Sequence, residues 1–281
     1  MKKCLKKEET DKAWVNYHSL DNQLMQNDSW LALETSTDVL SLAVARGSQV
    51  WSHTSAGGAK SSEQTLPQVL RLMQEADLAF SQLQAVVFGR GPGAFTGLRT
   101  ACSVAQGLAF GAGLKVLPID TLLAVADDAR QQLQDDQAKH TTHVHADIDT
   151  ATQVVTRVLT IVDARMDQVY VAAYEHTSTG WRCVQDAEVL HPEAVHWPAD
   201  WTAQHFVAAG NAWHLYAGRW PATMHATTQL EAMPTAQALL RLAPQAWRDG
   251  LAVAPEDALP LYIRDKVAQT TAERAQATMS T

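Results

Sequence analysis

The sequence predicts an α/β protein made of two similar lobes, and two observations support this prediction. The chain has 281 residues, of which 46% are hydrophobic and 19% are charged, so it can bury one large core or two ordinary ones. Short apolar runs typical of strands alternate with segments of helical period, and their order recurs once along the chain. The same composition excludes a disordered or fibrous protein.

Charge and cysteine content exclude further classes of protein. The formal net charge of −8 argues against a broad basic face that would bind nucleic-acid phosphates. The three cysteines form no C-x-x-C pair, so they indicate neither a disulfide framework nor a zinc knuckle. No apolar stretch reaches the roughly 18 residues that a membrane-spanning helix needs. We therefore expect a soluble cytoplasmic protein without membrane contact.

The first lobe is predicted at residues 30–130, after a loosely ordered extension at 1–29. Its first three strands are joined by polar turns, which is typical of an antiparallel meander. A glycine-rich turn at 89–97 follows the next strand and leads into a helix rich in small residues. The expected elements are strands at 30–34, 39–45, 49–54, 85–88 and 115–119, and helices at 61–76, 96–111 and 121–133.

Residues 131–157 differ in composition, because glutamine, aspartate, threonine and histidine dominate without an apolar period. This predicts a polar surface insertion rather than a metal site built on its histidines. The second lobe, at 158–268, repeats the first in order: a strand ending in a carboxylate, a turn, two more strands, a helix, a short strand with glycine, and a helix. A tail is predicted at 269–281.

The glycine-rich turn is the sharpest candidate site. A strand that feeds glycines into a helix N-terminus can direct backbone N–H groups at an anion. The spacing around Gly91 and Gly93 matches neither the dinucleotide-binding pattern nor the P-loop, although a strand ending at Asp120 keeps dinucleotide binding open. The glycines could equally serve only close packing of strand against helix. The residues alone leave these interpretations open.

Each half also places a carboxylate at the end of its first strand, Glu34 in one and Asp163 in the other. Opposed across a cleft, two such groups could organise magnesium and the phosphates of a nucleotide. Phosphate-binding turns are usually glycine-rich, whereas Arg165 and Met166 are bulky, so ordinary strand-end turns explain these residues better. The residues of this vestigial nucleotide cleft would be Glu34, Thr35, Ser36, Gly91, Gly93, Asp163 and Gly210.

Four segments together resemble the TsaB (YeaZ) family of bacterial proteins of tRNA threonylcarbamoyladenosine synthesis. In chain order they read LALETST at 31–37, GRGPGAFTGLR at 89–99, VDARMDQVY at 162–170 and PLYIR at 260–264. The resemblance covers residues 30–268. It implies an actin/Hsp70-like (ASKHA) fold of two duplicated lobes, in agreement with the pattern of elements.

The resemblance implies a binding partner rather than an independent enzyme. The catalytic relative TsaD carries an H-x-x-x-H metal pair after the strand that follows the glycine helix, and Thr121 and Val125 stand at those positions here. We therefore expect no catalytic residue, no metal and no cofactor of its own, with ATP or ADP as a candidate ligand at the interface with TsaD. A nucleotide-dependent enzyme that uses the cleft is the alternative.

The resemblance also implies which surface binds. TsaB-like proteins pair with TsaD, and with themselves, through the two helices of the first lobe. With the ATPase TsaE they support transfer of a threonylcarbamoyl group to the adenosine beside the tRNA anticodon. Because the chain is acidic, we expect tRNA to be contacted indirectly, through TsaD. The candidate interface residues are Leu66, Val69, Leu70, Met73, Leu98, Ala101, Ala105 and Leu108.

Overall fold

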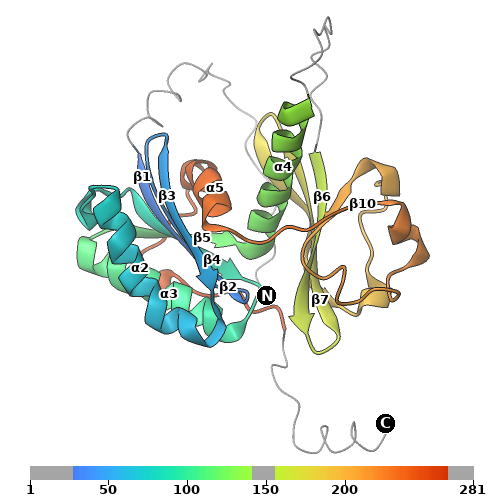
Figure 1. The fold of residues 1–281 in the computed structure, drawn as a ribbon, viewed down its shortest axis with the longest axis horizontal. Helices are drawn as coiled ribbons and strands as arrows, with labels where there is room; N and C mark the ends of the chain where they lie inside the picture. Colours follow the sequence, from blue (N-terminus) through green and yellow to red (C-terminus); the bar gives the residue numbers. More distant parts are fainter. Residues whose placement is uncertain (1–27, 141–155, 265–281) are drawn as a thin grey trace, which may run out of the picture.

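The computed structural model of the protein describes residues 28–140 and 156–264, which form two mixed sheets with helices packed on their faces (Figure 1). This confirms the predicted α/β fold of two lobes. Ser29, placed by sequence in the extension, already begins the first strand. The rest of that extension, apart from Asp28, and the predicted tail at 269–281 lie outside the described residues.

The first sheet has the strand order β3-β2-β1-β4-β5. Strands β1, β2 and β3 pair antiparallel, which confirms the predicted meander, and β4 and β5 add in parallel to β1. Strand β4 extends further than predicted, into the glycine-rich turn. The strands are β1 (Ser29–Glu34), β2 (Val39–Arg46), β3 (Gln49–Ala56), β4 (Ala85–Gly91) and β5 (Lys115–Asp120).

The second sheet repeats this topology. Its order is β10-β9-β6-β7-β8, with β6, β7 and β8 antiparallel and β9 and β10 in parallel, so each strand has a counterpart in the first sheet. The duplication inferred from sequence is therefore a duplication of topology. The strands are β6 (Thr156–Arg165), β7 (Gln168–Thr177), β8 (Gly180–Leu190), β9 (Val207–Ala209) and β10 (Thr228–Leu230).

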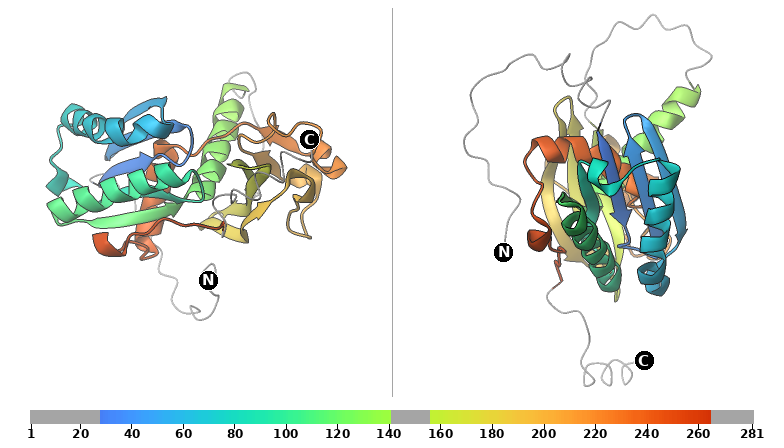
Figure 2. Two further views of the ribbon diagram at one scale, coloured as in Figure 1. Left: turned by 90° about the horizontal axis from the view of Figure 1, so that it is seen from below. Right: turned by 90° about the vertical axis from the view of Figure 1, so that its left-hand side faces the viewer.

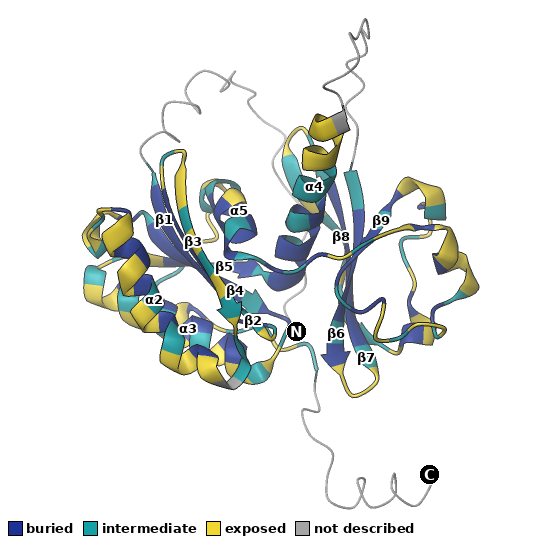
Figure 3. Ribbon diagram, in the orientation of Figure 1, coloured by how far each residue is buried: buried dark blue, intermediate teal, exposed yellow. Residues whose placement is uncertain are grey.

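Helices α2 (Ser61–Glu75) and α3 (Phe95–Ala112) cover one face of the first sheet, and the right-hand view of Figure 2 looks onto them. Alternate residues of β1 supply the two faces: Leu31 and Leu33 pack under α2 and α3, while Ala32 points to the other side. Buried side chains therefore occupy both faces of this sheet, and much of the ribbon of β1 has the colour of buried residues in Figure 3.

Between β8 and β9, where the repeat predicts a helix, the second lobe has no counterpart of α2, which is a correction to the predicted repeat. Residues 191–206 form only the short 3-10 turns η4 (Pro192–Ala194) and η5 (Ala203–His205). Large aromatic side chains fill the space over the sheet instead, with Trp201 and Trp213 at most 7% exposed. A few indole rings thus bury the apolar area that a helix would otherwise cover.

Two helices cross between the lobes, which the sequence did not indicate. Helix α5 (Ala236–Arg248), expected in the second lobe, packs on the alanine-rich face of the first sheet. Helix α4 (Thr121–His140), from the first half of the chain, packs on the second sheet. Both stand between the two sheets in Figure 1. The small side chains on that face of the first sheet let α5 approach closely.

Helix α4 also corrects the predicted insertion, because it continues to His140 instead of ending at Leu133. Polar pairs four residues apart support this extension: the Gln131 side chain donates to Asp135 at 2.8 Å and Gln132 donates to Asp128 at 2.9 Å. An exposed helical segment held by such polar pairs does not need apolar residues at helical spacing, so the sequence pattern did not reveal it. The remainder of the insertion, 141–155, lies outside the described residues.

Within the two described ranges, each helix falls short of the length and apolar character that a membrane crossing would require.

Candidate functional site

Two backbone donors of the glycine-rich turn between β4 and α3 are used within the protein. The Gly91 N–H donates to the Thr121 hydroxyl at 3.1 Å, and the Ala94 N–H donates to the Ser36 carbonyl at 2.7 Å. A Cβ at Gly93 would lie 2.6 Å from the Ser36 Cβ. The loop after β1 therefore occupies the space over the turn that a phosphate would need. Of the two interpretations of the turn, this geometry favours close packing.

Gly97, at the start of α3, shows the same close packing. A Cβ there would lie only 1.8 Å from the Thr35 carbonyl oxygen, while the Thr35 hydroxyl donates to the Gly97 carbonyl at 2.6 Å. By contrast, a Cβ at Gly107 on the same helix would meet no atom within 4 Å. The Thr35 backbone leaves no room for a side chain at position 97, whereas position 107 has room for one.

These two glycines give a matched pair of stability predictions. Gly97→Ala should lower the free energy of unfolding by about 2 kcal/mol, because the new methyl group collides with backbone. Gly107→Ala should raise it by about 1 kcal/mol, because alanine favours the helix and meets open space. Urea unfolding followed by tryptophan fluorescence measures both. Equal effects of the two substitutions would contradict this account of the turn.

Glu34 is fully buried at the end of β1 rather than exposed in a cleft. Its Oε1 accepts the Ser36 N–H at 2.6 Å, while Oε2 has no hydrogen-bond partner and lies over Gly89, where a Cβ would be 1.8 Å away. Burial raises the pKa of Glu34 to about 7, and hydrogen bonding from Ser36 only partly opposes the rise. The Glu34 carboxyl group therefore has no exposed surface toward a cleft from which it could contact magnesium.

The second carboxylate, Asp163 on β6, forms hydrogen bonds and an ion pair with residues of its own lobe. Its Oδ1 accepts from the Tyr216 hydroxyl at 2.8 Å and from the Arg165 N–H at 2.9 Å, and Arg165 Nε lies 3.4 Å from Oδ2. The Arg165 guanidinium also pairs with Asp38, in the loop after β1. Arg165 thus bridges the loop after β1 and the end of β6, the two places between which the predicted cleft would hold a nucleotide.

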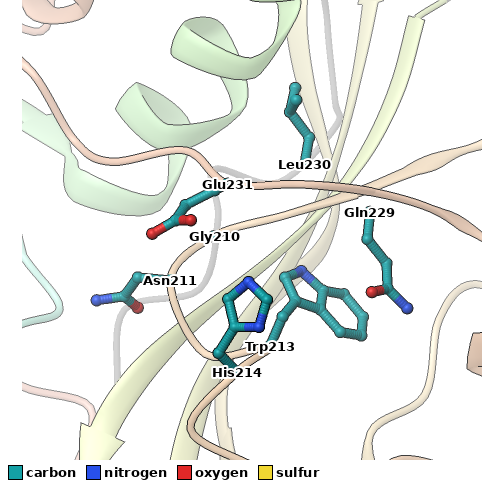
Figure 4. Close-up of a pocket in the computed structure, with 7 residues that line it drawn as sticks. All are labelled: Gly210, Asn211, Trp213, His214, Gln229, Leu230 and Glu231. Atoms are coloured by element: carbon teal, nitrogen blue, oxygen red, sulfur yellow. The ribbon is translucent and has the colours of Figure 1, made fainter. Parts of the chain in front are cut away.

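Gly210, the last of the candidate cleft residues, follows β9 and lies beside the end of β6, where the next residue, Asn211, accepts the Asp163 N–H through its side-chain oxygen at 2.9 Å. Its φ is 148°, and a Cβ would lie 1.9 Å from the Ile161 carbonyl oxygen, so the glycine serves strand packing. Figure 4 shows a pocket beside it, with a volume of about 220 Å³. The residues that line the pocket are Gly210, Asn211, Trp213, His214, Gln229, Leu230 and Glu231.

The predicted cleft is therefore not assembled as expected. Glu34, Thr35 and Ser36 are each at most 2% exposed, and Gly91 is buried as well. Gly93 is partly exposed but is covered by the loop after β1. The sequence pattern grouped these turns in one candidate cleft, but it could not show that the loop after β1 and the glycine-rich turn fill one another's space.

Thr121 and Val125 have structural roles at the positions that the resemblance aligned with metal ligands. Thr121 is buried and accepts the Gly91 N–H, and Val125 is buried against the second sheet. Asp120, the acidic residue of the dinucleotide interpretation, pairs with Arg90 at 2.5 Å. In the part of the chain that the structure describes, no three histidine, cysteine or acidic side chains gather as a metal site would require.

The outer surface of α2 and α3 corrects the predicted interface (Figure 3). Leu66 and Leu70 are 44% and 52% exposed, and Leu108 is partly exposed. The other five candidates are buried against their own sheet and cannot contact a partner while the lobe stays packed, because an amphipathic helix turns one face to its core. These five are Val69, Met73, Leu98, Ala101 and Ala105.

The structure adds residues that sequence reasoning missed on this surface. Phe110 is 79% exposed, and Gly107 and Gly111 on the same side of α3 have open space where side chains would stand. The sequence signal for this surface was the spacing of four residues between Gly107 and Gly111, which places both glycines on one side of α3. We define the helix face as Leu66, Leu70, Gly107, Phe110 and Gly111.

The duplicated strand order, with helices α4 and α5 between the sheets, places the chain among actin/Hsp70-like proteins. Comparison with known proteins is more specific. The model of the family "TsaD: tRNA N6-adenosine threonylcarbamoyltransferase" matches residues 42–272.

Two relatives are each named "tRNA threonylcarbamoyladenosine biosynthesis protein TsaB". The Escherichia coli K12 protein is 30% identical over 240 residues, covering 85% of this chain and 95% of the relative. The Haemophilus influenzae protein is 28% identical over 252 residues, covering 86% and 96%. The solved structure "YeaZ from Pseudomonas aeruginosa" is 35% identical with a TM-score of 0.70, covering 84% of this chain and 99% of that chain. The chain belongs to the TsaB (YeaZ) family.

Proposed function

We propose that this chain is a non-catalytic partner of TsaD in tRNA threonylcarbamoyladenosine biosynthesis, and that it acts in the cytoplasm. The names of its relatives support the pathway. The two strand-end carboxylates support a non-catalytic role, because Glu34 is buried and Asp163 is hydrogen-bonded within its own lobe. The chain would then support the active conformation of TsaD during transfer of the threonylcarbamoyl group to the adenosine beside the anticodon.

The observation that carries this proposal is the helix face. Glycine within a helix costs about 1 kcal/mol relative to alanine, so a glycine with open space around it gives the isolated lobe no benefit. Gly107 is such a residue, since a Cβ there would meet nothing within 4 Å. A missing side chain does allow the backbone of another helix to approach closely. The unfilled space therefore favours a docked helix.

Apolar groups around the glycines complete a surface suited to a protein partner. Leu66 and Leu70 lie four residues apart, on one side of α2, and Phe110 adds an exposed aromatic ring from α3. Exposed apolar side chains and positions without side chains are features that a helix-to-helix interface can bury. Two helices from this chain and two from TsaD would form a four-helix contact.

A second copy of this chain would use the same face, so homodimer and heterodimer should compete. We propose that TsaE joins the assembly through TsaD and this chain, and that tRNA is contacted through TsaD. Because Glu34, Thr35 and Ser36 are buried, ATP or ADP would bind at the interface with TsaD rather than in a cleft of this chain alone.

Reconstitution tests the proposal directly. TsaD and TsaE, with tRNA, ATP and a threonylcarbamoyl donor, should modify adenosine rapidly only when this chain is added, and the chain alone should form no product. Equal modification with and without this chain would overturn the proposal. ATP turnover by the isolated chain that Asp163→Ala abolishes would favour the alternative, a nucleotide-dependent enzyme.

A further inference from the structure

Residues 258–264 run from the first lobe to the second, past the glycine-rich turn, and we call them the strap. They include the last described residues, which cross between the lobes in the left-hand view of Figure 2. The PLYIR segment of the sequence lies within the strap.

The strap is fixed to the first lobe at α3 and at the end of β4. The Ala258 carbonyl accepts from Gln106 Nε2 at 3.0 Å, and the Leu261 N–H donates to the Arg90 carbonyl at 2.6 Å. The Tyr262 ring stacks on Phe95, the first residue of α3, with ring centroids 4.6 Å apart. These contacts join the strap to the helix that carries Gly107 and Phe110.

Arg264 fixes the end of the strap to the second lobe. Its Nη2 donates to the Ala164 carbonyl at 2.9 Å, to the Arg165 carbonyl at 3.2 Å and to Gln168 Oε1 at 2.8 Å. These acceptors lie at the end of β6 and the start of β7, on either side of the turn that joins the two strands. Hydrogen bonds that a guanidinium donates to several acceptors at once hold a turn in one position.

That turn needs such support, because its backbone is strained. Arg165, Met166 and Asp167 are consecutive non-glycine residues with φ of 60°, 56° and 61°. Each left-handed residue costs about 1 kcal/mol, so the conformation persists only where its surroundings fix it. In this conformation the turn presents Arg165 to Asp38 of the first lobe.

We propose that the strap holds the two lobes at one mutual angle by joining α3 to the β6–β7 turn. The Arg165–Asp38 pair is a weaker second tether, since its side chains are 68% and 75% exposed and exposed pairs contribute little. Of the two links that reach the β6–β7 turn from the first lobe, the strap is therefore the stronger, while α4 and α5 join the lobes elsewhere. This inference concerns the lobe angle and holds whatever partner docks on α3.

The distance between spin labels on the two lobes tests the proposal in the full chain. Labels at Val50→Cys on β3 and Leu215→Cys in the second lobe are both at exposed positions, at 52% and 60%. Serine replaces Cys4 and Cys183, and Cys102 is buried. Both Arg264→Ala and Tyr262→Ala should shift the distance distribution to longer values and broaden it.

Arg219→Ala is the matched control. This arginine contacts Asp167 of the same turn at 2.7 Å, but it does so from within the second lobe, so its loss should leave the distribution unchanged. Distributions of Arg264→Ala and Tyr262→Ala that superimpose on the parent would overturn the proposal, as would equal broadening by Arg219→Ala. Tyr262 is 45% exposed, so its variant decides the outcome if Arg264→Ala fails to fold.

Discussion

Leu70→Glu should weaken binding to TsaD by at least about 100-fold while leaving the chain folded. The Leu70 side chain is 52% exposed in the free protein, so a glutamate there is solvated and does not disturb the core. In the complex the same carboxylate would be buried against apolar groups without a partner, which is strongly unfavourable. Titration calorimetry or analytical ultracentrifugation with purified TsaD measures the loss, and the homodimer should be lost in parallel.

A matched control distinguishes this local effect from general surface charge. Leu215→Glu makes the same substitution at a leucine that is 60% exposed on the second lobe, and it should leave affinity for TsaD unchanged. A second test uses the open space at Gly107: Gly107→Leu should block docking, and Gly107→Ala should weaken it while stabilising the free chain. Undiminished affinity of Leu70→Glu and Gly107→Leu would show that the partner docks elsewhere.

Glu34 should make the chain less stable as the pH rises toward and through 7. Its pKa in the folded protein is about 7, above the 4.5 of an ordinary glutamate, so the folded state binds the proton more tightly than the unfolded state. The free energy of unfolding therefore falls between pH 4.5 and pH 7, by about 3 kcal/mol from this group. Glu34→Gln, which stays neutral, should remove that fall and stabilise the protein at pH 8.

Urea unfolding of parent and Glu34→Gln at several pH values between 4.5 and 8 measures this effect as the difference between the two proteins. Titration of all other groups cancels in that difference. Glu63→Gln, at an exposed position in the first turn of α2, controls for loss of a surface charge. A stability difference that stays constant with pH would mean that Glu34 ionises as an ordinary carboxyl group does.

The strands and the order of the lobes were predictable because apolar alternation and turn residues are local signals. The helix positions of the first lobe were also predictable, but the face that each helix turns to its sheet was misjudged at Val69 and Met73. Neighbouring apolar residues on a helix look alike until the sheet beneath is known. The exposed glycine Gly107 was the better indicator of the docking side.

The candidate cleft was less predictable than the fold. Sequence identified Glu34 as a strand-end carboxylate, but its burial depends on Gly89, which lies on a different strand and leaves room for the carboxyl group. The crossing of α5 onto the first sheet was also hidden, since an amphipathic helix does not specify which sheet it will cover. Such long-range pairings follow from the assembled topology alone.

The exchange of α4 and α5 between the sheets makes each half of the chain incomplete by itself. Without α5, the first sheet would expose the face that carries Ala32 and Val87, and without α4 the second would expose Val158 and Tyr174. Neither half can be excised as an autonomous folding unit. Evolution could alter the loops of either half freely, but recombination that replaced one half would have to preserve the helix on which the other depends.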